Sequence, residues 1–369
     1  MEQTEKPPAE RDLAITNVPW SALADLEPQA LGLTYRFRPP AEGPSERVEV
    51  RFVGQRLGVT GPPGPRDAFD VVHVLPRVLA GSGPVALTVR VLDLERGQWH
   101  ASAQGRVVTT TSRPPVSWHL PRAVANGATG FTPVVQVSAP RVTLGAWPVL
   151  VILGLAAGLL AQDVLASHLR LPPAETIAIS LGASVVGVLG AKVYFLALHR
   201  DQQLRGLPMV GMAVQGFVLS ATATAVASAA VLALPLGVYL DVLTAGLLVG
   251  LTIGRLGCFF GGCCAGRPTS SRLGRWSSDR TLGVRRVPTQ LLESSLSAVL
   301  AGLVTAVLWT GIARPHGVAF IGGLAAYTLG RQLLFPLRDQ PRTTARGRLV
   351  VLVVTLAILC VDLAVALLW

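Results

Sequence analysis

The pattern of apolar and polar positions divides the chain near residue 145. Before this point, short runs rich in β-branched residues alternate with turns that contain Pro and Gly. After it, long apolar runs follow one another with few charges. Short alternating runs are typical of half-buried strands, whereas about 20 consecutive apolar residues are long enough to cross a bilayer. The pattern therefore predicts a β-rich region followed by a membrane region.

In the first region, residues 1–30 are expected to form a polar lead-in and residues 31–142 an all-β soluble domain. Several short strands separated by turns favour a sandwich of immunoglobulin-like type, although no cysteine pair marks a true immunoglobulin domain. Its histidines are isolated from one another and are interpreted as structural or surface residues. The expected strands span 31–37, 47–54, 68–75, 85–94, 97–110 and 132–140.

In the second region, residues 146–369 are expected to form about seven transmembrane helices, because each apolar run has nearly the length of one crossing. The expected fold class is thus an α-helical polytopic membrane protein preceded by a soluble all-β sandwich. The expected spans lie near 147–167, 176–198, 209–233, 237–258, 290–311, 317–336 and 348–369.

The charge distribution supports this division and suggests partners. The formal net charge is +11, and the residues after 145 hold 17 Lys and Arg against 8 Asp and Glu. These basic residues lie between apolar segments, so the lipid bilayer, anionic head groups and substrate phosphates are the expected partners, and nucleic acid is not. The first 20 residues have no apolar core, so no cleavable signal peptide is expected.

Polar and charged residues, which are energetically costly within a membrane, gather at one side of the membrane region. Seven crossings place the N-terminal domain and the even-numbered loops on one side, which we call side A. Charged residues inside a membrane predict a functional site, although basic side chains at helix ends can also reach water without any role. Several arginines beside one carboxylate suit a phosphate-bearing lipid. The residues expected at side A are Lys192, Tyr194, Gln215, Arg255, Gln290, Glu293 and Arg331.

The segment GRLGCFFGGCCAGRPT (254–269) combines five glycines with three cysteines, Cys258, Cys263 and Cys264. A structural zinc site needs four ligands, and no other Cys or His lies near in the sequence, so no metal is expected. A disulfide that joins Cys263 to Cys258 or to Cys264 stays open. Small packing residues are the favoured interpretation.

This segment, together with VPTQLLES (287–294), resembles the signature of prolipoprotein diacylglyceryl transferases. Further segments are similar to the family's other motifs in the same order, and the resemblance covers about residues 145–369. It implies a multi-pass enzyme of the bacterial cytoplasmic membrane. The further segments are LGAKVYF (189–195), GLPMVGMAVQG (206–216), YLDVLTAGLLVGLTIGR (239–255) and YTLGRQLLFPLRDQP (327–341).

The resemblance implies transfer of the diacylglyceryl group of phosphatidylglycerol to the lipobox cysteine of a preprolipoprotein, with no metal or diffusible cofactor. Arg255 and Arg331 would hold the phosphate, whereas Gln290, Glu293 and Gln215 would orient the head group or the thiol. The residues that would bind the substrates are Gly254, Gly257, Cys258, Gly262, Cys263, Gly266, Arg267, Lys192, Tyr194, Arg286 and Tyr327.

The sequence departs from the family pattern at three polar positions. Cys258 stands where the family usually has Asn, Cys263 where it has an acidic residue, and Gln215 where it has His. These differences favour a second hypothesis, an inactive or substrate-altered relative that binds membrane lipid or lipoproteins. A transporter or channel would instead place polar residues along a whole pathway. The family places side A outside the cytoplasmic membrane, whereas Arg-rich loops favour the cytoplasm, so the side of the N-terminal domain stays open.

Overall fold

The computed structural model describes residues 12–17, 21–108, 118–198, 212–339 and 346–368, and the first residues of the motif expected at 206–216 lie outside this part. By packing, the chain divides into two compact units. The β unit comprises Met1–Pro148, Leu256–Leu291 and Leu337–Pro341, and the helical unit comprises Val149–Arg255, Leu292–Pro336 and Arg342–Trp369. The domain boundaries expected from composition stay predictions.

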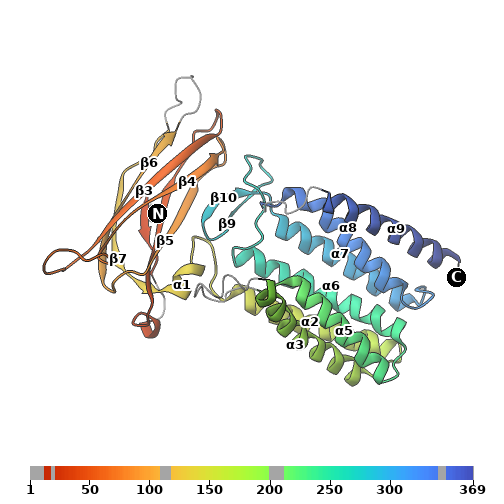
Figure 1. The fold of residues 1–369 in the computed structure, drawn as a ribbon. Helices are drawn as coiled ribbons and strands as arrows, with labels where there is room; N and C mark the ends of the chain where they lie inside the picture. Colours follow the sequence, from red (N-terminus) through yellow and green to blue (C-terminus); the bar gives the residue numbers. More distant parts are fainter. Residues whose placement is uncertain (1–11, 18–20, 109–117, 199–211, 340–345, 369) are drawn as a thin grey trace, which may run out of the picture. The chain divides into compact units, whose positions relative to one another are not determined.

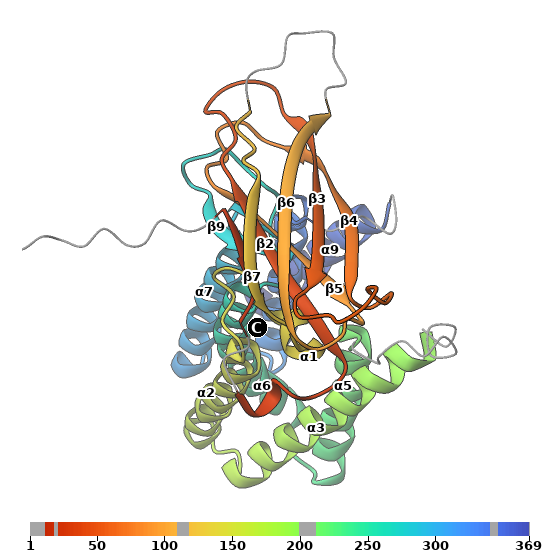
Figure 2. The same cartoon turned by 90° about the vertical axis from the view of Figure 1, so that its left-hand side faces the viewer.

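Two sheets of antiparallel strands pack face to face in the β unit. Strands β1, β2 and β5 lie in one sheet, and β4, β3, β6 and β7 lie in this order in the other (Figures 1 and 2). This order is that of strands A, B and E against C′, C, F and G of immunoglobulin-like domains, which confirms the expected sandwich. The strands are β1 (Leu13–Ile15), β2 (Gln29–Phe37), β3 (Glu46–Arg56), β4 (Ala68–Val78), β5 (Val85–Leu92), β6 (Gln98–Val108), β7 (Ala123–Ala128) and the short β8 (Gly130–Phe131), which pairs with β2.

The sandwich core follows from the alternation in the sequence. On β3, Val48, Val50 and Phe52 are fully buried, and the residues between them are less buried. Burying each such side chain contributes about 1.5–3 kcal/mol. Tyr35 of β2 is buried among them and donates its hydroxyl hydrogen to the carbonyl of Pro121 at 2.7 Å. Burial, with a smaller contribution from Asp12, raises the pKa of Tyr35 to about 12, so this donor stays protonated.

The strand expected at 132–140 is wrong, because residues Thr132–Val137 form the helix α1. Pro133 lies in the first turn of this helix. Backbone N–H groups in the first turn make no hydrogen bond within the helix, so a proline there costs none, and its fixed φ already has a helical value. Strand β7 is absent from the expected set because its sequence, AVANGA, has few β-branched residues. Its Gly127 lets β1 approach, since a Cβ there would lie 2.8 Å from the side chain of Ile15.

Two strands from between the membrane helices extend the first sheet. Strand β10 (Leu282–Arg286) pairs with β5, with Leu282 opposite Leu87 and Gly283 opposite Ala86. Strand β9 (Arg275–Ser278) pairs with the other edge of β10. Val284 is 3% exposed within the sandwich core. The N-terminal strands and this loop therefore share one hydrophobic core.

We expect the pairing of β10 to be sensitive to a side chain at Gly283. An added Cβ would lie 2.5 and 2.6 Å from ring atoms of Trp276 and 3.3 Å from the Cβ of Ala86. Gly283→Ala is expected to displace the ring and to lower the free energy of unfolding by roughly 1–3 kcal/mol. Thermal unfolding in detergent measures this change. Gly182→Ala, where a Cβ meets nothing within 4 Å, is the control, and an equal effect of both would contradict the prediction.

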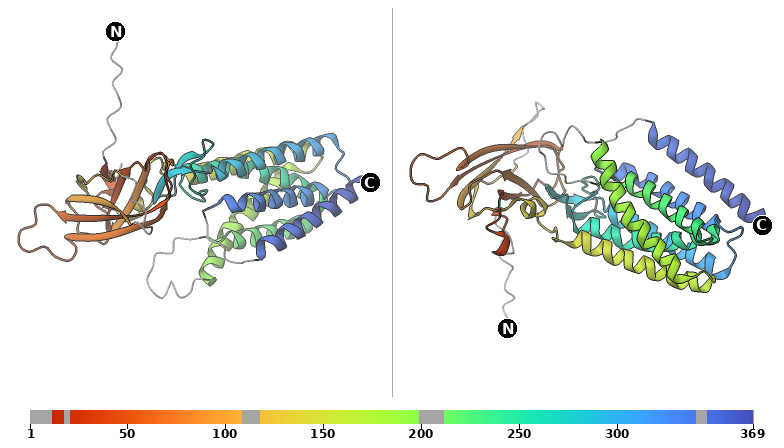
Figure 3. Two further views of the ribbon diagram at one scale, coloured as in Figure 1. Left: turned by 90° about the horizontal axis from the view of Figure 1, so that it is seen from above. Right: turned by 60° about the horizontal axis from the view of Figure 1, so that its bottom comes forward.

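Apart from the short α1, the described α-helices lie between residues 146 and 368 (Figure 3). Of the described helices, six are long and apolar enough to cross a membrane, and the apolar part of α5, Gln215–Val231, is shorter. This confirms the α-helical polytopic fold class, with each expected span matched by one helix. The helices are α2 (Ala146–His168), α3 (Pro173–Leu198), α5 (Val214–Val231), α6 (Leu236–Phe260), α7 (Thr289–Thr310), α8 (Val318–Leu334) and α9 (Gly347–Leu368).

Glycines allow α2 and α6 to touch through their backbones. A Cβ at Gly158 would lie 2.5 Å from the carbonyl oxygen of Gly246, and one at Gly154 would lie 2.7 Å from that of Gly250. In a membrane the hydrophobic effect does not drive helices together, and close packing of this kind stabilises their association instead. This packing fixes α6, which carries Arg255.

The pairing of β10 with β5 constrains the number of membrane crossings. Strand β5 precedes α2 and β10 follows α6, yet both lie in one sheet. The stretch between them must therefore begin and end on the same side, which requires an even number of crossings. Helices α2, α3, α5 and α6 satisfy this requirement only if α5 crosses too.

Candidate active site

Arg255 near the end of α6 and Glu293 near the start of α7 form a buried ion pair. The Nε atom of Arg255 lies 2.9 Å from Oε2 of Glu293, and the two side chains are 12% and 0% exposed. Removing two charges from water is costly, and attraction offsets this cost only where the geometry is well held. An ion pair within apolar helices is by default a functional-site hypothesis.

Neighbouring helices hold the ion pair in place. The hydroxyl oxygen of Tyr327 on α8 lies 3.4 Å from Nη2 of Arg255. Ser294 of α7 donates its hydroxyl hydrogen to the carbonyl of Thr252 on α6 at 2.7 Å, which fixes these two helices against each other. The Arg255 guanidinium is thus contacted by groups from two other helices.

The remaining residues expected at side A in the helical unit lie on separate helices. Arg331 is half-buried on α8, four positions after Tyr327 and so on the same helix face. Lys192 on α3 is half-buried, whereas Tyr194 on α3 and Gln215 on α5 are exposed. The structure brings Arg255, Glu293 and Tyr327 together, and the roles of the other four stay predictions.

An apolar groove of about 700 Å³ lies between α6 and α7. Val249, Thr252 and Ile253 line it from α6, and Ala298, Gly302 and Trp309 are among the residues that line it from α7. Thr252 precedes Arg255 by about one helical turn, so one end of the groove lies next to the ion pair. A groove of this size and composition is typical of sites that hold apolar ligands.

In the β unit, the signature segment folds into a tight loop after α6. Gln290 of α7 donates its side-chain N–H to the carbonyl of Cys263 at 2.9 Å. Gly262 has a φ of 64°, and a Cβ at Gly266 would lie 2.1 Å from the carbonyl oxygen of Val287. Glycine is therefore required at these two positions by the backbone itself, whereas a Cβ at Gly254 would meet nothing within 4 Å.

Arg286, expected to bind substrate, is fully buried in the β unit. Its guanidinium donates to the carboxylates of Asp279 at 2.5 Å and Asp339 at 2.6 Å, and to the carbonyls of Gly266 and Leu282 at 3.0 and 3.1 Å. Such a set of acceptors joins three segments of the chain.

Arg267 is exposed beside these segments. Its Nε–H donates to the carbonyl of Arg338 at 3.2 Å, and its backbone N–H to that of Leu337 at 2.8 Å. The substrate-binding roles of Arg267 and Arg286 stay predictions.

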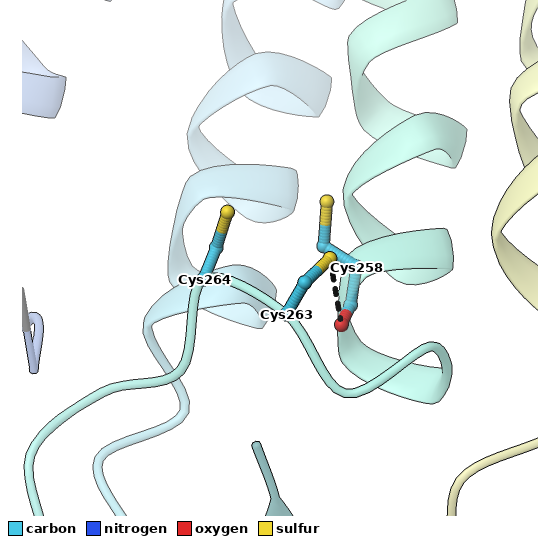
Figure 4. A group of neighbouring side chains, drawn as sticks. All are labelled: Cys258, Cys263 and Cys264. Atoms are coloured by element: carbon cyan, nitrogen blue, oxygen red, sulfur yellow. Dashed lines mark hydrogen bonds between the residues drawn. The ribbon is translucent and has the colours of Figure 1, made fainter. Parts of the chain in front are cut away.

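The three cysteines of the signature segment lie together in the β unit. Cys258 is buried on the last turns of α6, and Gly257 beside it accepts a backbone hydrogen bond from Gly261 at 2.8 Å. Cys263 and Cys264 follow in the loop, and all three sulfur atoms lie within 4.8 Å of one another (Figure 4). Hydrogen bonds to the thiols of Cys258 and Cys264, together with burial, raise the pKa of the Cys263 thiol.

Sequence reasoning did not find the partners of the buried charges. Asp279 and Asp339 lie in loops and stand out by no motif, so only the fold shows that they meet at Arg286. The carboxylate of Asp241 on α6 accepts the backbone N–H groups of Gly317 and Phe320 at 2.7 and 2.8 Å at the start of α8. A carboxylate there is favoured by the helix dipole.

Comparisons with known proteins give a consistent result. A sequence model of the family "Prolipoprotein diacylglyceryl transferase" matches residues 134–369, more than half of the chain. Over 107 residues, 28% of this chain, it is 30% identical to a phosphatidylglycerol–prolipoprotein diacylglyceryl transferase of Clostridium tetani. Over 106 residues, it is 33% identical to a second such protein, from Clostridium perfringens. The matched parts span 42% and 40% of these curated relatives.

The matched region contains the six described helices that are long and apolar enough to cross a membrane, the shorter helix α5, the ion pair and the loop that follows α6. The β sandwich lies almost wholly before it. The resemblance in the signature segment and the match of the family model therefore concern the same part of the molecule. The chain belongs to the prolipoprotein diacylglyceryl transferase family.

Proposed function

We propose that the protein transfers the diacylglyceryl group of phosphatidylglycerol to the lipobox cysteine of a preprolipoprotein in a bacterial cytoplasmic membrane. The observation that carries the proposal is the buried Arg255–Glu293 ion pair at one end of an apolar groove between α6 and α7. The names of the curated relatives, which specify the lipid donor and the prolipoprotein acceptor, support it.

The reaction exchanges one bond to a lipid carbon for another. The cysteine sulfur attacks the diacylglyceryl carbon that carries the phosphate, a C–S bond forms, and the C–O bond to phosphate breaks. Glycerol 1-phosphate leaves with the electron pair, and the thiol hydrogen is released as a proton. Negative charge develops on the leaving phosphate oxygen, so a fixed cation in a dry site lowers the barrier.

Arg255 is suited to this electrostatic role. Arginine stays charged and matches phosphate oxygens with two parallel N–H groups. Glu293 holds the Nε side of the guanidinium, and Tyr327 is near Nη2. Arg331 lies four positions after Tyr327 on α8 and would contribute the second positive charge. Gln290 donates a hydrogen bond to the Cys263 carbonyl and would orient the loop after α6 toward the acceptor peptide.

The groove between α6 and α7 is suited to an acyl chain of the lipid donor. Gly302 contributes to its wall, and a Cβ there would meet nothing within 4 Å. Gly302→Leu is expected to fill the groove and to lower kcat/KM for long-chain phosphatidylglycerol by roughly one order of magnitude, as expected for a steric mismatch in an apolar pocket. Transfer kinetics with long-chain and short-chain donors measure this effect.

Gly182→Leu is the matched control, since Gly182 is an exposed glycine of α3 that also has open space around it. It is expected to retain the kinetics of the unmodified protein. Equal losses for the two variants, or a loss for Gly302→Leu that does not depend on chain length, would contradict a role of the groove in acyl-chain binding.

The experiment that tests the function itself is a transfer assay. Purified full-length protein in phosphatidylglycerol vesicles is mixed with a peptide that contains a lipobox cysteine. The expected result is a diacylglyceryl mass increase on the peptide cysteine, which is lost with Arg255→Ala. Absence of transfer by a folded protein that still binds phosphatidylglycerol would overturn the proposal and favour a lipid-binding relative. That alternative is motivated by Gln215, Cys258 and Cys263, which differ from the usual family residues.

A further inference from the structure

The three cysteines at the end of α6 form a cluster to which the proposed transfer reaction assigns no chemical step. Cys258 lies on the helix, and Cys263 and Cys264 lie in the loop that follows it (Figure 4). The sulfur atoms lie within 4.8 Å of one another, and each of the three carries a thiol and not a disulfide. Three thiols from so short a segment converge only because the chain turns back at Gly261 and Gly262.

The backbone of this turn is held by several bonds. The N–H of Cys263 donates to the carbonyl of Cys258 at 3.0 Å, and the carbonyl of Cys263 accepts the Gln290 side chain at 2.9 Å. Cys264 has a φ of 55°, a left-handed conformation that non-glycine residues rarely adopt. Its carbonyl accepts the hydroxyl of Thr289 at 3.4 Å. The backbone that carries Cys263 and Cys264 is thus held in place, and only the side chains need to rotate when a ligand binds.

The spacing of the sulfur atoms is close to that of a metal-thiolate site. Three sulfurs bound to one ion in a plane, each about 2.3 Å from it, lie about 4 Å from one another. The observed upper limit of 4.8 Å requires only small side-chain rotations to reach this spacing. Soft thiolate ligands select zinc, copper(I) and iron–sulfur clusters.

The number of ligands decides among these metals. A structural zinc site takes four protein ligands, and an iron–sulfur cluster takes four cysteines. Zinc sites with three protein ligands and a water include at least one histidine in their usual ligand sets. Among the described residues, the group that could hold a metal here consists of these three cysteines alone. A three-coordinate thiophilic ion, copper(I), matches this set.

The loop also supplies positive charge. Arg280 donates its Nε–H to the carbonyl of Gly261 at 2.7 Å, next to the turn that carries Cys263. Residues 259–287 contain six arginines and a single acidic residue, Asp279. Coordination by three thiolates leaves a net negative complex, which cationic surroundings stabilise.

We propose that Cys258, Cys263 and Cys264 form a binding site for one copper(I) ion. Each thiol loses its proton to solvent on binding, three Cu–S bonds form, and no electron is transferred. The site belongs to the β unit and does not depend on the transferase activity proposed above.

The test uses the full-length protein in detergent, reduced and kept free of oxygen. Copper(I) is titrated against a chromogenic copper(I) chelator, and X-ray absorption reports the number of sulfur ligands. The expected result is one equivalent of copper(I) bound by three sulfurs. Cys258→Ser, Cys263→Ser and Cys264→Ser are each expected to weaken binding at least tenfold. Cys360→Ser removes the exposed cysteine of α9 and is expected to bind copper(I) as the unmodified protein does.

Several results would overturn the proposal. The first is less than one equivalent of copper(I) bound by the reduced, folded protein. The second is that Cys360→Ser weakens copper(I) binding as much as the three cluster variants do. The third is a disulfide between two of the three cysteines in protein purified without reductant and resistant to reduction, seen by mass spectrometry of peptides. The unfolding temperature of each variant shows whether a loss of binding follows from loss of the fold.

Discussion

Arg255→Ala is expected to lower diacylglyceryl transfer by a factor on the order of 10²–10³, the usual cost of removing one group that stabilises charge in a transition state. It is also expected to destabilise the protein by about 3–5 kcal/mol, because Glu293 would remain fully buried without its 2.9 Å partner. The two effects have different origins. A loss of activity in this variant alone would therefore not separate a catalytic role from a structural one.

The double variant Arg255→Met, Glu293→Leu makes this separation. Replacing both members of a buried ion pair with apolar residues of similar size is often neutral for stability or increases it. We expect the double variant to unfold at nearly the temperature of the unmodified protein and still to lack transfer activity. Thermal unfolding in detergent and the vesicle assay measure the two properties on the same preparation.

Arg314→Ala is the control, because Arg314 is exposed in the loop after α7, beyond the opposite end of that helix from Glu293. It is expected to retain transfer activity. A double variant that recovers both stability and activity would show that the charges of Arg255 and Glu293 are not needed for the reaction.

Arg286→Ala is expected to destabilise the β unit by about 3 kcal/mol, the lower end of the usual cost of breaking a buried ion pair. The substitution removes a fully buried guanidinium from two carboxylates and two carbonyls. Asp279 and Asp339 are 33% and 45% exposed, so water compensates part of their loss. The two carbonyl acceptors, of Gly266 and Leu282, would lose a charged donor.

Arg286→Lys tests whether geometry or charge is responsible. A lysine ammonium is a compact charge and cannot reach four acceptors arranged around a planar fork, so we expect it to recover less than half of the lost stability. Arg272→Ala, in the exposed part of the same loop, is expected to change the unfolding temperature little. Tryptophan fluorescence follows the transition. If Arg286→Ala unfolds at the temperature of Arg272→Ala, the proposed structural role is wrong.

Sequence reasoning predicted the parts of the fold that local periodicity determines. Each apolar run became one helix, because a crossing needs a fixed length of apolar residues. The alternation around Val48, Val50 and Phe52 gave a strand for the same kind of local reason. Arg255 and Glu293 were found because charges are rare within apolar helices, although nothing local shows that they touch.

The parts that were not predicted depend on contacts between distant segments. The sequence of β10, LGVRR, is too short to be recognised as a strand, and its pairing with β5 follows from the complete sandwich. The convergence of Cys263 and Cys264 with Cys258 depends on a turn with left-handed residues, which spacing alone does not predict. Asp279 and Asp339 meet only through Arg286.

The pairing of β10 with β5 also has a consequence for the order of assembly during synthesis. The strands β1 to β7 leave the ribosome first, but the edge of β5 that β10 covers stays open until α2, α3, α5 and α6 have been made. An open strand edge can pair with other chains, so this interval is the one most exposed to aggregation. The sheet can therefore be completed only after α2, α3, α5 and α6 have been synthesised.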